Sequence, residues 1–403
     1  MMLNRPYLRG LSVSLLLLVG LFTHQGASSQ EDLEREFFEG MGEMEQEYKD
    51  FEQAAFEEFQ REVQAMWQDF VVSTKKDWVE YSGDKTGRTR VDFEKGEVQV
   101  EVLVPKKQAE KDPALVTERL SQELERLVED RGKNRDYPLP APPEPKEPAP
   151  VPAPPKEIPP APLLPRPVLE GQLQTKAGQS VTQDNKKEFV REILETVPVK
   201  EEALKTEEGE MVKAKVAFAL VPDHLRIRAK KYLASVRSQS SRFDINVPLA
   251  FSVIHTESYF NPKAKSPAPA FGLMQLVPRS GARDAYKFVY GEEKTLSPDY
   301  LYVPENNVEL GCAYLGLLKN HYFKNVKNPE SALYCAVASY NTGPGNLSRA
   351  FVGQPRLKPA IDRVNTMDPE EVFTHLRAHL PYEETRDYIK RVRDRMSLYK
   401  EWE

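Results

Sequence analysis

The sequence is poor in cysteine and lacks the features typical of a nucleic-acid-binding chain. Only Cys312 and Cys335 occur among 403 residues. Both lie in apolar helical patterns, which favours two buried thiols, although export would also allow a disulfide. The chain has no basic cluster and no aromatic platform, and a glycine loop for phosphates is also absent. These absences argue against a nucleic-acid partner and against a nucleotide cofactor.

Long apolar runs are absent as well. The longest, Leu11–Phe22, is too short to cross a hydrocarbon core of about 30 Å. It follows two arginines and precedes the small residues Ala27 and Ser29, which is the pattern of a signal peptide over residues 1–29. An uncleaved anchor is the alternative interpretation. No cysteine follows the leader to carry a lipid, so we expect an exported, periplasmic chain without a stable transmembrane anchor.

Acidic charge is concentrated in one segment. Residues 31–70 carry fourteen acids and three bases, and the rest of the mature chain is slightly basic. Apolar residues recur there at steps of three and four, which predicts an acidic amphipathic helix over residues 30–70. Its seam comprises Phe37, Met41, Met44, Tyr48, Phe51, Ala55, Phe59, Val63, Met66 and Phe70. The helix could pair with a partner or fold back on its own chain, and the second is the favoured interpretation.

A change of period marks the next segment. Residues 89–93 and 97–102 alternate polar and apolar side chains around Lys95-Gly96, which predicts a β-hairpin. A helix is expected over residues 112–131, and a further strand pattern covers residues 212–218. These elements predict a small α+β domain.

Proline interrupts that domain. Residues 138–167 hold fifteen of the 33 prolines, a composition that favours polyproline II structure and cannot pack a core. We therefore predict a disordered linker over residues 137–168. The flanking ranges 71–136 and 169–222 are then two parts of one domain.

From Pro222 onward the pattern is helical, which predicts a compact all-α domain over residues 223–403. Pro248, just after Asn246, marks the start of one helix. The other expected helices cover residues 223–243, 306–323, 329–341, 369–379 and 382–400.

Glu257 is the candidate acid of this helical domain. It continues the apolar stripe of the helix that begins near Pro248, so its carboxyl should face the core. Burial disfavours the charged form and raises the pKa of a carboxyl, which can then act as an acid near neutral pH. Taken alone, a buried glutamate that caps a neighbouring loop is the more common case.

Three separated motifs surround that acid. They are Glu257–Pro262 with Phe271–Leu276, then Ala338–Gly345, then Pro381–Tyr388. In this order they resemble the soluble lytic transglycosylase family, which shares the goose-type lysozyme fold. The resemblance covers about residues 225–400.

The front half has a weaker resemblance. Residues 78–104 and 212–232 look like the N-terminal domain of the membrane-bound murein transglycosylase C group. The sequence departs from that group because it has no lipid-anchored cysteine and contains the proline tract. These departures concern anchoring and not the chemistry.

The resemblance implies a lyase that acts on peptidoglycan without a cofactor or a metal. Glu257 would protonate the oxygen between N-acetylmuramic acid and N-acetylglucosamine, and would then take the proton of the muramic C6 hydroxyl that attacks C1. The product is a 1,6-anhydro end. Because the nucleophile is internal, no second placed carboxylate is needed, and no second acid stands at a position comparable to Glu257 in the motifs. Ordinary glycoside hydrolysis needs two placed carboxylates.

The resemblance also implies roles for the first part of the cleft. Ser266 should bond near the muramic sugar, and Gly272 should let the backbone approach the glycan. Met274 and Gln275 should line the cleft.

Further roles fall in the last two motifs. Tyr340 should lie beside Glu257 and hold the acetamido group or the developing cation. Asn341 should bind substrate or brace the turn that follows it. Glu384 should line the cleft or pair with a nearby cation, and Tyr388 is interpreted as a packing residue.

Other interpretations remain at this stage. A lysozyme-like muramidase would use the same fold as a hydrolase, and a wall-binding scaffold would keep the fold without activity. Cell-wall protein partners could bind residues 31–70 or the proline tract. His375 and His379 are spaced like a metal pair, but no third ligand is near, so we expect no metal site.

Overall fold

A computed structural model gives the fold for most of the chain. Its described residues 58–133, 161–267 and 269–403 form one compact unit, which holds the five-stranded sheet and the helical domain described below. The predicted signal peptide and most of the predicted acidic helix lie outside the described residues. In the part that is described, no helix combines the length and the apolar character needed to cross a membrane. The structure describes residues 53–133, 139–140, 157–158, 161–267 and 269–403.

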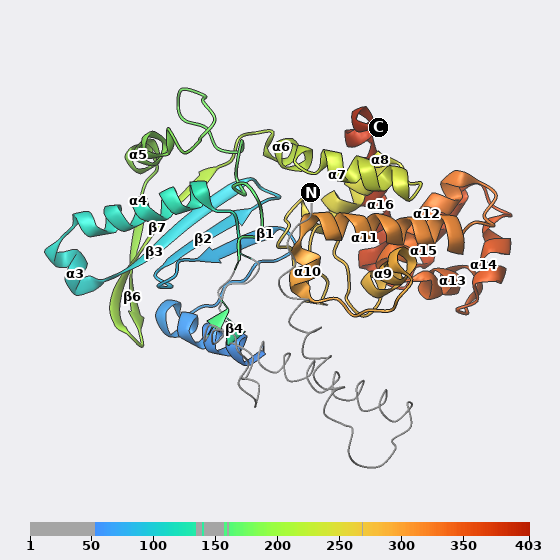
Figure 1. Cartoon of the computed structure of the whole chain (residues 1–403), viewed down its shortest axis with the longest axis horizontal. Coiled ribbons are helices and arrows are strands. Elements are labelled where there is room, and N and C mark those ends of the chain that lie inside the picture. Colours follow the sequence, from blue (N-terminus) through green and yellow to red (C-terminus); the bar gives the residue numbers. More distant parts are fainter. Residues whose placement is uncertain (1–52, 134–138, 141–156, 159–160, 268) are drawn as a thin grey trace, which may run out of the picture. The chain divides into compact units, whose positions relative to one another are not determined.

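A five-stranded antiparallel sheet forms the core of the N-terminal domain (Figure 1). The strands lie in the order β1-β2-β3-β7-β6, and β3 pairs with β7 over its whole length. The proline tract lies between these two strands in the sequence, so it interrupts a single domain, as predicted. The strands are β1 (Asp77–Tyr81), β2 (Gly87–Asp92), β3 (Glu97–Pro105), β6 (Lys200–Thr206) and β7 (Gly209–Ala219).

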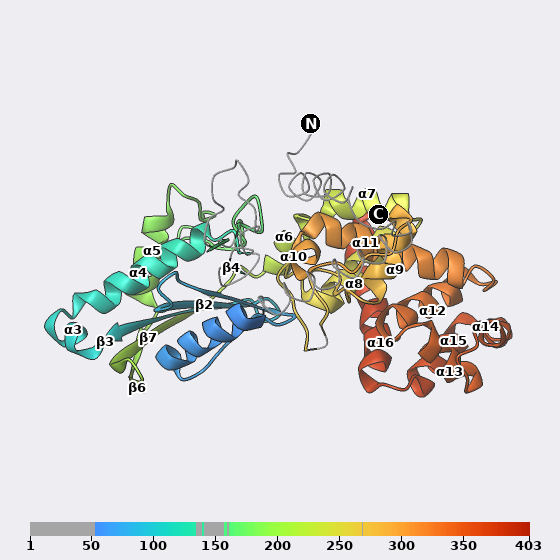
Figure 2. The same ribbon diagram turned by 60° about the horizontal axis from the view of Figure 1, so that its bottom comes forward.

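Both faces of this sheet are covered. On one face, α4 (Ala114–Glu129) and α5 (Lys186–Thr196) pack over alternate strand residues such as Val100 and Val102 (Figures 1 and 2). A short α3 (Lys106–Lys111) precedes α4. The hairpin turn between β2 and β3 contains a glycine with positive φ, a conformation that costs glycine little.

A helix that runs over residues 53–67 covers the other face. Phe59, Val63 and Trp67 are buried there against Val79 and Tyr81 of the sheet. This part of the predicted acidic helix therefore folds back on its own chain. The sequence pattern predicted Met66 on the buried side of this helix. In the structure Trp67 is buried there, and Met66 is only partly buried.

Parts of this domain were not predicted from sequence. β1 and β6 have no clean alternation, since β1 is buried on both faces and β6 is largely exposed. α5 was also missed, because the element expected between the proline tract and Pro222 was the strand pattern of residues 212–218. Within the proline tract, β4 (Leu139–Pro140) and β5 (Glu157–Ile158) form a two-residue antiparallel pair. Packed structure resumes by Val168, which is buried in the domain core.

The C-terminal domain is all-α among its described residues, apart from isolated bridges, which confirms the predicted fold class. Its helices are α6 (His224–Lys230), α7 (Leu233–Arg242), α8 (Val247–Ser258), α9 (Gly281–Tyr290), α10 (Pro298–Tyr302), α11 (Pro304–Leu317), α12 (Pro329–Thr342), α13 (Pro344–Val352), α14 (Leu357–Val364), α15 (Pro369–His379) and α16 (Glu383–Met396).

α8 is the central helix of this domain. It is apolar on all sides, with Leu249, Phe251 and Ile254 fully buried, so it must be surrounded by other helices. The two cysteines lie on the neighbouring helices α11 and α12 and are buried free thiols. They act there as small apolar side chains.

The helix predictions were right where an apolar stripe was long and wrong elsewhere. The single helix expected over residues 223–243 is in fact two helices, α6 and α7, which are separated at Lys231 and Tyr232. α11 continues into a π-helical turn at Leu318–Tyr322, and α16 into a 3₁₀ turn at Ser397–Trp402. The short helices α9, α10, α13 and α14 were not predicted.

Candidate active site

Glu257 lies in the last turn of α8. The helix begins where Asn246 accepts a hydrogen bond from the Leu249 N–H at 2.8 Å, with a proline in the first turn. It ends because Tyr259 and Phe260 take left-handed backbone conformations, with φ of 51° and 61°. Glu257 therefore projects from the end of a rigid buried helix.

The Glu257 side chain is buried, with 4% of its surface exposed. Burial is the main reason that the pKa of this carboxyl is raised above its ordinary value. Lys75 opposes the shift, because its ammonium lies 3.5 Å from the carboxylate and favours the charged form. Glu384 acts in the same direction as burial through repulsion.

Two tyrosines complete the surroundings of the carboxyl. Tyr340 on α12 donates its hydroxyl proton to the Met274 carbonyl at 2.8 Å, and burial together with Glu257 raises its pKa. The Tyr388 hydroxyl on α16 is buried, and no well-formed hydrogen bond to it exists in the described part of the chain. It lies close enough to Glu257 to lower the pKa of the carboxyl. Both phenols therefore stay protonated beside the acid.

The loop after α8 is held by Asn307 on α11. Its side-chain amide donates to the carbonyls of Phe271 and Leu301, at 2.8 and 2.7 Å. Its carbonyl oxygen accepts the Met274 N–H at 2.7 Å. Asn307 is fully buried, and sequence reasoning did not find it. This one side chain fixes the backbone whose Met274 carbonyl orients Tyr340.

Gly272 and Met274 have reasons within the fold. Gly272 has a φ of 77°, and a Cβ there would collide with Asn307 and the Leu301 carbonyl. The glycine is thus needed for close packing of the loop on α11. The Met274 side chain is fully buried in the helical core, where it packs against Gly311, so it does not line an open cleft.

Gln275 presents an acceptor that the described residues leave unused. Its amide nitrogen donates to the carbonyls of Ala264 and Gly272, at 2.9 and 3.0 Å. Its side-chain oxygen is buried and has no hydrogen-bond donor among the described residues. Ser266 lies in the same loop, mostly buried, and its N–H donates to the Ala270 carbonyl at 3.2 Å.

The two predicted residues that remain are Asn341 on α12 and Glu384 on α16. Asn341 accepts a hydrogen bond from the Thr385 hydroxyl at 2.6 Å, so its side chain links these two helices. Glu384 is 69% exposed, and its carboxylate lies 3.7 Å from Lys75. Lys75 therefore stands between Glu384 and Glu257, and sequence reasoning missed it entirely.

The histidines lie apart from this constellation. His255 bonds to the Tyr399 hydroxyl at 2.9 Å, on another side of α8. His375 bonds to the Ala350 carbonyl and stacks against His379 and Phe351. Among the described residues, no group of three His, Cys, Asp or Glu side chains is placed to hold a metal.

His255 should make the fold sensitive to acid. Burial lowers its pKa to about 3, whereas the unfolded residue takes up a proton near 6.5. The unfolded state is protonated first, so stability is lost as the pH falls from about 6.5 toward 3. Between pH 7 and pH 5 we expect this residue to cost about 2 kcal/mol of unfolding free energy. Urea unfolding at both pH values should show a smaller difference for His255→Phe, while exposed His321→Gln should unfold like the parent.

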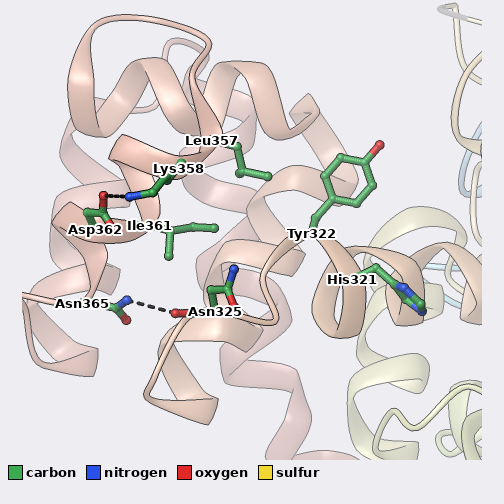
Figure 3. A pocket seen from close by; sticks show the side chains of 8 residues that line it. All are labelled: His321, Tyr322, Asn325, Leu357, Lys358, Ile361, Asp362 and Asn365. Carbon is green, nitrogen blue, oxygen red and sulfur yellow. Dashed lines mark hydrogen bonds and ion pairs between the residues drawn. The ribbon is translucent and has the colours of Figure 1, made fainter.

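A separate hollow lies away from the acid (Figure 3). It is formed by the π-helical turn, α14 and the segments next to them, and no predicted site residue lines it. Its lining residues are His321, Tyr322, Asn325, Leu357, Lys358, Ile361, Asp362 and Asn365.

Comparison with known proteins identifies the family. The transglycosylase SLT domain model matches residues 234–361. The model for the N-terminal domain of membrane-bound lytic murein transglycosylase C matches residues 44–123. Membrane-bound lytic murein transglycosylase C of Actinobacillus succinogenes is 30% identical over 338 residues, which cover 83% of this chain and 85% of that protein. The chain belongs to this family.

Other members show a similar level of likeness. The membrane-bound lytic murein transglycosylase C of Mannheimia succiniciproducens is 29% identical over 83% of this chain and 85% of that protein. That of Pectobacterium atrosepticum is 29% identical over 85% of this chain and 88% of that protein. Among solved structures, the 70-kDa soluble lytic transglycosylase of Escherichia coli is 26% identical, covering 42% of this chain and 24% of its own, with a TM-score of 0.32. The two family models and the relative from Actinobacillus succinogenes confirm the family resemblance predicted from sequence.

Proposed function

We propose that this chain is a peptidoglycan lytic transglycosylase. It cleaves the β-1,4 bond between N-acetylmuramic acid and N-acetylglucosamine and leaves 1,6-anhydro-muramic ends. Family membership supports the reaction class. The observation that carries the assignment of the acid is the buried Glu257 carboxyl, whose pKa is raised by burial at the end of a rigid helix. Such a carboxyl keeps its proton closer to neutral pH than an exposed one does.

In this proposal Glu257 acts twice. It first donates its proton to the bridging oxygen, and the resulting carboxylate then accepts the proton of the muramic C6 hydroxyl as that oxygen attacks C1. No water is consumed. Tyr340, fixed by its bond to the Met274 carbonyl, is placed beside the carboxyl to hold the acetamido group or the developing cation.

The other predicted residues fall into two groups under this proposal. Ser266, Gln275 and Glu384 contact the glycan, and the unused acceptor oxygen of Gln275 can take a hydroxyl or amide proton from it. Gly272, Met274 and Asn341 act through the protein instead. They support the loop and the helices that carry the contact residues.

The remaining parts of the chain have their own proposed roles. Residues 1–29 direct export to the periplasm, where murein lies, and residues 223–403 carry the catalytic site. The acidic range 30–70 and the proline tract offer surfaces for cell-wall protein partners. The ranges 71–136 and 169–222 form the domain that packs beside the catalytic domain.

A digest of purified sacculi with the chain lacking residues 1–29 tests the reaction. Mass spectrometry of the released muropeptides should show anhydro ends, which are one water lighter than hydrolysed ends. Glu257→Gln is the matched control and should release anhydro ends at a rate lower by roughly 10²-fold or more. If the parent released no product while still binding sacculi, the chain would be a binding module and the proposal would be wrong.

A muramidase is the second candidate, and Glu384 is the observation in its favour. A hydrolase of this kind needs a second carboxylate near the acid, and Glu384 shares Lys75 with Glu257. The same digest separates the two reactions, since hydrolysis would give reducing muramic ends and Glu384→Gln would then abolish turnover. A transglycosylase should still release anhydro ends in that variant, at a rate lowered only by the altered contact with the glycan.

A further inference from the structure

Lys75 reaches the candidate acid from the other domain. It lies in the loop just before β1, and its ammonium is 3.5 Å from the Glu257 carboxylate and 3.7 Å from that of Glu384. Glu257 and Glu384 both belong to the helical domain. One cation of the sheet domain is therefore shared by two carboxylates of the helical domain.

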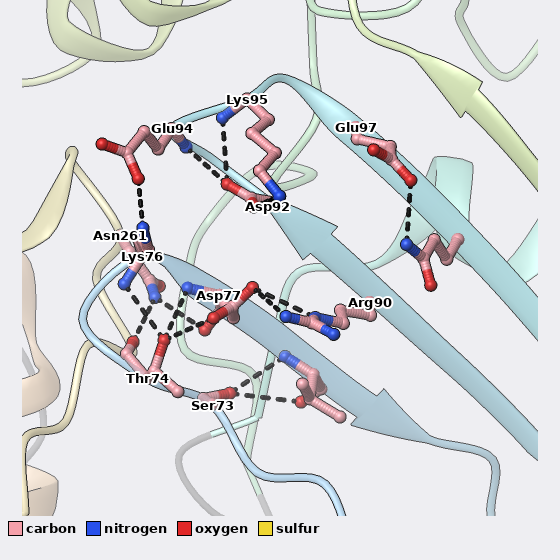
Figure 4. Close-up of polar contacts among 12 residues, drawn as sticks. Ser73, Thr74, Lys76, Asp77, Arg90, Asp92, Glu94, Lys95, Glu97 and Asn261 are labelled. Carbon is pink, nitrogen blue, oxygen red and sulfur yellow. Dashed lines mark hydrogen bonds and ion pairs between the residues drawn. The ribbon is translucent and has the colours of Figure 1, made fainter.

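The loop that carries Lys75 is closed by its own hydrogen bonds (Figure 4). The Thr74 N–H donates to the Asp77 carbonyl at 3.0 Å, and the Thr74 hydroxyl donates to the Asp77 carboxylate at 2.6 Å. The Asp77 N–H in turn donates to the Thr74 hydroxyl oxygen at 3.1 Å. Arg90 of β2 holds the Asp77 carboxylate from the far side. All of these bonds lie within the sheet domain, so they hold the turn without any contact from the helical domain.

Asn261 fixes this turn to the segment that follows Glu257. Its fully buried side chain donates to the carbonyls of Thr74 and Asp77, both at 3.1 Å. Asn261 is four residues after Glu257, in the same motif, so one short segment holds both Glu257 and the turn with Lys75. A second interaction connects the two domains, because Lys263 forms an ion pair with the buried Glu80 of β1 at 2.9 Å.

The charged and titratable groups that bear on Glu257 come from three other elements. They are Lys75 from the loop, Tyr340 from α12, and Tyr388 with Glu384 from α16. Arg395, also on α16, is directed elsewhere and donates to Thr256 and Tyr259. The positive charge of Lys75 favours the ionised form of Glu257, whereas burial and the negative charge of Glu384 favour the protonated form.

We propose that Lys75 is a positioning residue that sets the protonation of Glu257 during the reaction. This inference rests on the proposed function of Glu257. By stabilising the carboxylate, Lys75 makes Glu257 a stronger acid toward the bridging oxygen and supports the charge left after the proton has moved. Its side chain is 36% exposed, so it can shift toward Glu384 when a glycan enters. The sheet domain thereby acts on the chemistry of the helical domain.

The test is the pH profile of kcat/KM for release of anhydro-muropeptides by the full exported chain. Its alkaline limb reports loss of the proton from Glu257. An opposite charge at this distance lowers a carboxyl pKa by one unit or more, so Lys75→Met should move that limb upward by about one pH unit. The plateau rate should fall in the same variant, because the acid becomes weaker.

Three further variants keep the test specific. Lys75→Arg should preserve the limb, since it keeps the charge. Glu384→Gln should move the alkaline limb to lower pH. The variant removes the repulsion between the Glu384 and Glu257 carboxylates, and Lys75 then pairs with Glu257 only. The adjacent Lys76, which pairs with Glu94, provides the matched control, and Lys76→Met should leave the profile unchanged. An active Lys75→Met enzyme with the parent's alkaline limb would overturn the inference and leave the proposed function intact. A parent without anhydro products would instead refute the function on which it rests.

Discussion

Glu257→Gln is expected to lower turnover of glycan strands by roughly 10²–10⁴-fold, the range that a general acid and base contributes. The substituted amide has nearly the same shape and can neither give nor take the proton. Because Glu257 is buried at the end of α8 and its charge is costly there, the neutral amide should leave the fold intact. Initial rates of anhydro-muropeptide release measure the effect.

The matched control for this change is Glu383→Gln. Glu383 is an exposed residue next to Glu384 at the start of α16, and its substitution alters the same net charge. We expect parental rates from it. If Glu257→Gln bound sacculi and kept more than a tenth of the parental rate, another residue would have to be the acid.

Lys263→Met is expected to destabilise the chain by about 3–5 kcal/mol, the usual cost of removing one partner from a buried ion pair. Lys263 lies over Trp78 and pairs with Glu80, and both charged side chains are at most 5% exposed. The substitution removes the ammonium that lies 2.9 Å from the buried Glu80 carboxylate, which keeps a hydrogen bond from the Lys133 N–H at 3.3 Å and the more distant Lys133 ammonium at 3.9 Å. Urea unfolding followed by circular dichroism measures the loss.

Two companion variants identify the cause. The double substitution Lys263→Met with Glu80→Leu removes both charges and should recover much of the lost stability, because the desolvation cost disappears with them. Lys358→Met breaks a solvent-exposed pair with Asp362 and should change stability very little. Equal losses in the single and the double variant would mean that packing around Lys263 matters and that the ion pair does not.

Local sequence information was enough to single out Glu257 as the candidate acid. Glu257 continues an apolar stripe and stands in a motif whose partners follow in order, so periodicity and motif spacing both point to it. The same reasoning placed Tyr340 beside it, and the structure brings these two side chains together. The roles of the loop residues were less accessible, since whether Met274 faces a cleft or the core depends on how the loop packs against α11.

Residues that act through tertiary contacts carried no local signal. Lys75 is one of many lysines in the sequence and becomes distinctive only when the turn at Thr74–Asp77 meets Asn261. Asn307 lies in an apolar helix with no motif around it, and its three bonds exist only because the loop folds over α11. Tyr388 was interpreted as a packing residue, since helical spacing alone cannot show which side chain its ring faces.

The front half shows the same division. Clean alternation predicted the hairpin of β2 and β3, whereas β1 was missed because both of its faces are covered. The helix over residues 53–67 buries Trp67 because the sheet determines which side of the helix faces inward. A repeat of apolar residues predicts that one side of the helix is buried. Which residues form that side depends on the surface against which the helix packs.

The pairing of β3 with β7 affects how this chain reaches its fold. The two strands are about a hundred residues apart in the sequence, so the sheet cannot close until the proline tract and everything around it has emerged. Contacts this distant slow folding. Loop closure depends only weakly on length, at about 0.6 kcal/mol for each doubling. The tract can therefore lengthen or shorten over evolution with little effect on the stability of the domain that it interrupts.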